Sequence, residues 1–169
     1  MALDLQPLGV QPPRPRARWL APLSIALASL ITILPVVATV PFLPPFGLLM
    51  LLGWRLLRPD ALRVWVAAPL GLFDDLVSGQ PFGSAMFLWM ACMLIIDVLE
   101  TRIVWRNFWQ DWLIAAGATG FVLIAGRFIA SPISAKVDAA LLVQAGASSM
   151  LFPLASRLCA WLDRDVVKA

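Results

Sequence analysis

Two adjacent aspartates, Asp74 and Asp75, stand in the otherwise apolar stretch GLFDDLVSGQPFG (residues 71–83). Paired carboxylates can act as general acid and base, or they can bind a metal ion. They can also form a polar lock inside a membrane, or lie in water at the end of a helix. The sequence contains no histidine, the commonest general base and metal ligand. We therefore predict no catalytic residue, no metal and no cofactor, and we favour the remaining uses of these acids.

The composition identifies the surroundings in which these acids lie. Of the 169 residues, 61% are hydrophobic and 14% are charged, and the mean hydropathy is +0.86. Soluble domains are about half apolar and about a quarter charged. A soluble fold of this composition would expose large apolar patches and aggregate. The sequence therefore predicts an integral membrane protein.

Six apolar segments are separated by proline, glycine or charged residues, and a membrane-spanning helix needs about 20 residues. The segments cover residues 19–40, 42–57, 61–77, 83–100, 109–130 and 138–162. The predicted fold is an all-α polytopic membrane protein with a bundle of six transmembrane helices, or five if residues 42–57 do not cross. We expect residues 1–18 to be a disordered cytoplasmic tail, 19–162 the helical bundle, and 163–169 a short cytoplasmic tail.

The basic residues predict the orientation of this bundle. With the N-terminus inside, only Arg127 and Lys136 of the 13 lysines and arginines fall outside, as the positive-inside rule requires. Seven of the eight tryptophans then lie near inner helix ends, and Trp89 alone lies mid-span. We predict a multi-pass protein of the bacterial inner membrane with both termini in the cytoplasm. The basic charge then favours anionic membrane lipid as a partner, and we expect no nucleic acid.

In this topology Asp74 and Asp75 lie near the outer end of segment 61–77, about 16 Å along a helix from Arg63. Neighbouring helical positions are about 100° apart, so we expect one acid to face the bundle and the other to face headgroups or a partner. Arg127 matches them in depth. We predict a cluster of Arg127 with Asp74 or Asp75, whereas the alternative is that Arg127 reaches lipid phosphate.

A second set of charges is predicted at the inner side. Asp97 and Glu100 end segment 83–100, close in depth to Arg55, Arg63 and Arg157. Charged side chains in membrane segments usually pair with one another. We expect one or two inner-side ion pairs with a structural role.

The order of two motifs resembles a known family. LPPFGLLMLLGWRLLRP (residues 43–59) precedes GLFDDLVSGQPFG, and this order resembles the rod shape-determining protein MreD family. That family has an early P-x-x-x-L-l-x-l-y-W run and then G-x-x-x-D-x-x-x-G-x-x-l-G. The matching positions are Pro45, Trp54, Pro59, Gly71, Asp75, Gly79 and Gly83. Gly53 replaces the family's aromatic residue, and the doubled acid leaves open whether Asp74 or Asp75 is the equivalent.

The resemblance implies a non-enzymatic membrane scaffold of the bacterial cell-wall elongation complex. Such a protein would bind MreC and link MreB filaments to RodA and a class B penicillin-binding transpeptidase. The family is also likened to the six-helix S components of energy-coupling factor vitamin transporters. That likeness implies the fold and a rival function, the binding or transport of a small ligand. A membrane enzyme acting on lipid phosphate is a third hypothesis, but one Asp-Asp pair falls short of the several acids expected.

Overall fold

Helices form all the regular structure in the part of the chain that the computed structural model describes, which is residues 15–31, 44–102, 107–130 and 139–168. The α-helices are α1 (Pro15–Leu30), α3 (Phe46–Leu57), α4 (Ala67–Ser78), α5 (Ser84–Arg102), α6 (Phe108–Ala130) and α7 (Ala139–Lys168). Two 3₁₀-helices, η2 (Pro59–Ala61) and η3 (Val64–Val66), connect α3 to α4. The predicted all-α fold class is confirmed.

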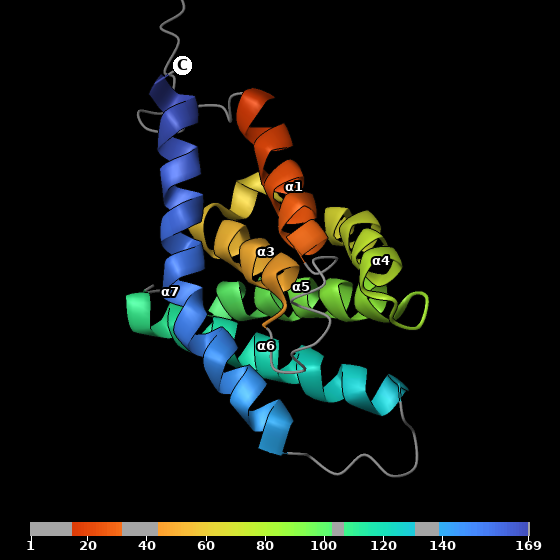
Figure 1. The fold of residues 1–169 in the computed structure, drawn as a ribbon. Helices are drawn as coiled ribbons and strands as arrows, with labels where there is room; N and C mark the ends of the chain where they lie inside the picture. Colours follow the sequence, from red (N-terminus) through yellow and green to blue (C-terminus); the bar gives the residue numbers. More distant parts are fainter. Residues whose placement is uncertain (1–14, 32–43, 103–106, 131–138, 169) are drawn as a thin grey trace, which may run out of the picture.

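Helix α3 lies at the centre of this arrangement. Its residues from Gly47 to Leu56 are all buried, and both α1 and α7 pack against it. Figure 1 shows α7 on one side of α1 and α3, and α4 on the other side. Twelve residues of helix are about 18 Å long, which is shorter than a hydrocarbon core of about 30 Å. Helix α3 is therefore a core element enclosed by longer helices.

Helices α4 and α5 form a closely packed hairpin, and α6 packs against α5 and α7. Helix α4 also contacts α1 on its other side. The hairpin turn contains two glycines with positive φ, Gly79 at 69° and Gly83 at 88°. Residues other than glycine rarely adopt this backbone conformation. The glycines therefore allow α4 and α5 to lie side by side.

Two of the described helices, α5 and α6, are long and apolar enough to cross a membrane. They correspond to the predicted segments 83–100 and 109–130. The membrane character of the chain is supported to this extent, and the bundle of six spans stays a prediction. Part of segment 19–40 lies outside the described residues.

Helices extend into both segments that were predicted to be tails. Helix α1 begins at Pro15, so the end of the predicted N-terminal tail is helical, whereas residues 1–14 lie outside the described part. Helix α7 continues to Lys168 through nearly all of the predicted C-terminal tail.

The prediction of one helix over residues 61–77 is wrong. This region contains η2, an extended residue at Leu62, η3 and then α4, which starts only at Ala67. Pro69 explains the late start, because proline lacks an N–H and fits best in the first turn of a helix. The estimate of about 16 Å between Arg63 and Asp74 assumed a continuous helix and does not hold.

Gly71 should be intolerant of any side chain. A Cβ atom there would lie 2.7 Å from Cα of Met86 and 2.8 Å from the carbonyl oxygen of Ala85. Since these are backbone atoms, α4 would have to move away from α5. We expect Gly71→Ala to destabilise the purified protein by about 2 kcal/mol, measured as a lower midpoint of thermal unfolding.

Gly117→Ala in α6 is the matched control, because a Cβ atom there would meet nothing within 4 Å. It should leave stability unchanged or raise it by about 0.5 kcal/mol. Equal midpoints for the two variants would contradict the close approach of α4 to α5.

Candidate functional site

The carboxylate of Asp75 lies at the start of α5, although Asp75 itself belongs to α4. Its side chain is buried, with 2% of the residue exposed. Four groups donate hydrogen bonds to its oxygens: the backbone N–H groups of Gly83 (3.0 Å), Ala85 (2.9 Å) and Met86 (3.3 Å), and the hydroxyl of Ser84 (2.9 Å). Asp75 therefore caps the N-terminus of a helix that begins nine residues after it.

This contact stabilises both the unpaired N–H groups at the start of α5 and the buried carboxylate of Asp75. The first N–H groups of a helix have no partner within the helix, and they carry a partial positive charge. A buried carboxylate has lost its water and is costly without hydrogen bonds. The carboxylate supplies acceptors to the N–H groups, and the N–H groups supply donors to the carboxylate. Hydrogen bonds to a charged group are also stronger than those between neutral groups.

The four spaced motif positions act together in the hairpin. Gly71 and Asp75 are four residues apart and so lie on the same face of α4, the face that packs on α5. Gly79 ends α4, and its N–H donates to the carbonyl oxygen of Asp75 at 3.1 Å. Gly83 then places its own N–H against the carboxylate. Asp75, rather than Asp74, is thus the acid that contacts the start of α5 together with these glycines.

Asp74 turns toward a different pair of helices. One of its carboxylate oxygens lies 3.1 Å from the position of a Cβ atom at Gly47, the second residue of α3. The Ser29 hydroxyl of α1 also interacts with this carboxylate. We expected one of the two acids to face headgroups or a partner. Instead both approach neighbouring helices, because α4 is packed on two sides.

Arg127 lies near the end of α6, and its side chain is exposed. The hydrogen bonds that the Asp75 carboxylate accepts in the described structure come from residues 83–86. The cluster of Arg127 with Asp74 or Asp75 stays a prediction.

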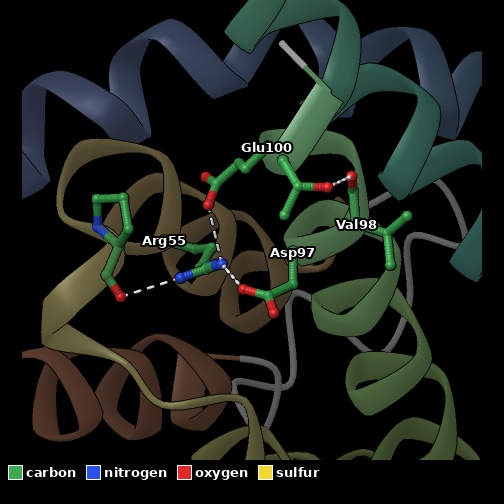
Figure 2. Close-up of polar contacts among 6 residues, drawn as sticks. Arg55, Asp97, Val98 and Glu100 are labelled. Carbon is green, nitrogen blue, oxygen red and sulfur yellow. Dashed lines mark hydrogen bonds and ion pairs between the residues drawn. The ribbon is translucent and has the colours of Figure 1, made fainter. Parts of the chain in front are cut away.

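At the opposite end of α5, a second polar cluster surrounds Arg55 of α3 (Figure 2). Arg55 is buried, with 4% of the residue exposed. Its guanidinium group donates to Asp97 at 2.6 Å, to Glu100 at 2.9 Å and to the carbonyl oxygen of Pro59 at 2.9 Å. A buried charge is stable only when it is paired and hydrogen-bonded, so these contacts tie α3 to α5.

The structure does not bring all the predicted inner-side residues into this cluster. The side chains of Arg63 and Arg157 are exposed. Sequence reasoning missed a further ion pair, Arg58 with Asp163 at 2.9 Å, which connects the end of α3 to α7. Neither the spacing nor the type of these two residues indicated that pair.

The sequence placed Trp54 among the tryptophans near inner helix ends, but the structure packs it in the core. Its side chain is fully buried, and its Nε1–H donates to the Ser24 hydroxyl of α1 at 2.8 Å. At Gly53, a Cβ atom would lie 2.9 Å from Sγ of Cys159. The close packing of α7 therefore leaves no room for the aromatic residue that the motif has at that position. Pro45 precedes the first residue of α3, and its carbonyl oxygen accepts the N–H of Leu49.

Comparison with known families decides what this arrangement belongs to. A family model described as rod shape-determining protein MreD matches residues 14–156 of the chain. The chain belongs to the MreD family. Searches of curated proteins and of solved structures found no significant match.

The match includes both polar clusters and the whole α4–α5 hairpin. MreD is a shape-determining structural family rather than an enzyme family, and the polar groups described above bind one another. In the described residues, no group of three or more potential metal ligands comes together. The contacts described above are those of helix capping and ion pairing.

Removing the Asp75 carboxylate should strongly destabilise the protein. Asp75→Ala leaves three N–H groups at the start of α5 without an acceptor, and each buried unsatisfied group costs about 1–3 kcal/mol. We expect a loss of about 3 kcal/mol or more in the free energy of unfolding, and a smaller loss for Asp75→Asn, which keeps one carbonyl acceptor. Thermal or denaturant unfolding in detergent measures both.

Ser78→Ala in the same helix is the control for that series. Its exposed hydroxyl donates to the carbonyl oxygen of Asp74, and its loss should change stability by less than about 0.5 kcal/mol. A loss for Asp75→Ala no larger than for Ser78→Ala would contradict the capping role.

The Arg55 cluster should show energetic coupling that a partly exposed pair does not. A double-mutant cycle of Arg55→Met and Glu100→Gln should give a coupling energy of about 1–3 kcal/mol. The same cycle for Arg58→Met and Asp163→Asn should give less than about 1 kcal/mol, because the Arg58 side chain is 40% exposed. Unfolding free energies supply both values, and additive effects in the first cycle would contradict the ion pair.

Proposed function

We propose that this protein is a non-enzymatic membrane scaffold of the cell-wall elongation complex, which binds MreC and links MreB to the peptidoglycan synthases. Membership of the MreD family over residues 14–156 carries this proposal. The family is part of the MreBCD shape-determining system, so MreC is the first partner to test. RodA and a class B penicillin-binding transpeptidase would be reached through the assembled complex.

In this proposal the protein spans the bacterial cytoplasmic membrane several times, with both termini in the cytoplasm. Two long apolar helices, α5 and α6, support a membrane location. The uneven distribution of lysine and arginine supports the orientation. The Arg55 cluster would then lie at the cytoplasmic side of α5, and the Asp75 cap at the periplasmic side.

The structure suits a scaffold because its polar groups are used to hold helices in place. Asp75 is fixed by the start of α5, and Arg55 by the end of α5. A helix held at both ends presents its exposed side chains at constant positions. Among these are Phe87, Leu94 and Val98, which a partner in the membrane can contact.

The rival function, small-ligand binding by an S-component-like subunit, lacks comparable support. Two grooves in the described structure, one between α5 and α6 and one between α1 and α7, are lined almost wholly by apolar side chains. A vitamin-sized polar ligand needs a few convergent polar groups. That function stays an untested alternative.

Depletion of the protein in its own bacterium tests the proposal. We expect rod-shaped cells to become round with delocalised wall synthesis, and a plasmid copy of the wild type or Gly117→Ala to restore rods. Asp75→Ala should fail to do so, because the α4–α5 hairpin is disrupted. Immunoblots of membrane fractions would show whether that failure comes from lost protein or from lost function.

The partner is tested in the same strain. Affinity purification of the tagged wild type from membranes should recover MreC. Rods that persist after depletion, together with a nutrient requirement, would contradict the scaffold and favour the transport alternative.

A further inference from the structure

Helix α7 contains a proline, Pro153, near its middle. Proline has no backbone N–H, so the carbonyl oxygen four residues earlier, that of Ser149, receives no hydrogen bond from this position. The proline ring also pushes that carbonyl group aside and bends the helix. Figure 1 shows the bend: the N-terminal part of α7 slants across α6, whereas the C-terminal part runs beside α1.

A side chain of another helix supplies the missing donor. The indole Nε1–H of Trp112 in α6 donates to the carbonyl oxygen of Ser149 at 3.0 Å. This carbonyl group is the one that Pro153 leaves without a backbone partner. In apolar surroundings an unsatisfied carbonyl group is costly, because water does not reach it. Trp112 therefore takes the place of the N–H that the proline lacks.

The indole ring of Trp112 is packed against a second aromatic ring. Trp109 and Trp112 meet edge to face with their ring centroids 6.1 Å apart. Phe108 contacts Trp109 in the same way, at 6.5 Å. Aromatic pairs prefer this geometry. The packing restricts the orientation of the Trp112 ring, so that its N–H stays directed at α7.

The turns of α7 that precede the proline favour bending. They contain Gly146, Ser148 and Ser149, and glycine and serine form helices less readily than alanine or leucine. A Cβ atom at Gly146 would meet nothing within 4 Å, so close packing does not require the glycine. The Ser148 hydroxyl donates to the carbonyl oxygen of Gln144 at 2.7 Å, a contact that often bends helices. These features weaken α7 beside the bend.

The two parts of α7 are attached to different neighbours. After the proline, Sγ of Cys159 lies 2.9 Å from the position of a Cβ atom at Gly53 of α3, and Asp163 pairs with Arg58. Before the proline, the carbonyl contact with Trp112 joins α7 to α6. A change in the bend would therefore move α6 relative to α3.

We propose that α7 contains a hinge at Pro153 that Trp112 latches. With its indole N–H bonded to Ser149, the bend is fixed and α6 keeps one position relative to α3. When this bond is lost, the two parts of α7 take a range of relative orientations. Trp112 is thus a positioning residue. The inference goes beyond the proposed function and does not depend on it, because it concerns contacts within one chain.

Pro153→Ala provides the first test, because it restores the backbone N–H that Ser149 lacks. Trp112→Phe keeps an aromatic ring and removes the donor. In the purified full-length protein, we expect Trp112→Phe to lower the midpoint of thermal unfolding by about 3 °C more in the wild type than in Pro153→Ala. The loss of indole packing is common to both backgrounds and cancels in this difference.

The second test measures motion, as the distance distribution between two spin labels in double electron–electron resonance. The labelled cysteines replace Leu23 of α1 and Leu142 of α7, which are 59% and 64% exposed. We expect Trp112→Phe to widen this distribution at least twofold, and added Pro153→Ala to restore it. The control pair, Leu23 with Leu158 in the C-terminal part of α7, should keep its width in every variant.

The native cysteines, Cys92 and Cys159, are buried, and labelling of the protein without introduced cysteines measures their background. If Trp112→Phe does not fold by itself, its rescue by Pro153→Ala is the expected result, and failure of that rescue contradicts the latch.

Three other results would overturn the proposal. Equal midpoint losses in the two backgrounds would mean that Trp112 acts through packing alone. An unchanged distribution for the Leu23–Leu142 pair in Trp112→Phe would mean that the bend is rigid without the latch. Equal widening of both label pairs would mean general loosening of the bundle rather than a hinge. None of these results bears on MreC binding, so the hinge and the proposed function can fail separately.

Discussion

The contact between the Asp75 carboxylate and the N-terminus of α5 is the interaction on which the α4–α5 hairpin depends. Backbone N–H groups at a helix start must find acceptors, and in apolar surroundings water does not supply them. In this protein the acceptor comes from the preceding helix. Gly71 lets the two backbones approach closely enough for the contact, and Gly79 and Gly83 provide the turn that aims the carboxylate. The motif residues Gly71, Asp75, Gly79 and Gly83 therefore act together to hold the α4–α5 hairpin.

The neighbouring acid shows why two carboxylates stand together in an oily stretch. Adjacent positions on a helix point about 100° apart, so α4 can direct Asp75 to α5 and Asp74 to the first turn of α3. The target of Asp75 is a positive helix N-terminus, whereas Asp74 also interacts with Ser29 in the last turn of α1. Arg55 adds the complementary contact at the other end, where its guanidinium group is bound to Asp97 and Glu100 near the end of α5. Helices α3, α4 and α5 are thus held by polar contacts inside an apolar bundle.

Much of the fold could be predicted from hydropathy, because long apolar runs ended by charge or glycine mark helices such as α5 and α6. The short helices were harder. Pro69 sets the start of α4, and the predicted span that ignored it was wrong. The capping role of Asp75 was not predicted, because helix periodicity describes one helix at a time and this contact joins two. The buried position of Trp54 was missed for a similar reason, since its partner Ser24 lies thirty residues away.

A shape-determining scaffold needs surfaces that stay in place, and the paired anchoring of α5 provides one. Hydrogen–deuterium exchange of the purified protein tests the central contact most directly. In the wild type, the amides of residues 83–86 should be strongly protected. In Asp75→Asn they should exchange at least tenfold faster, while the amides in the middle of α6 keep their wild-type rate. Unchanged protection at residues 83–86 would contradict the account, because the carboxylate would then not be what holds the start of α5.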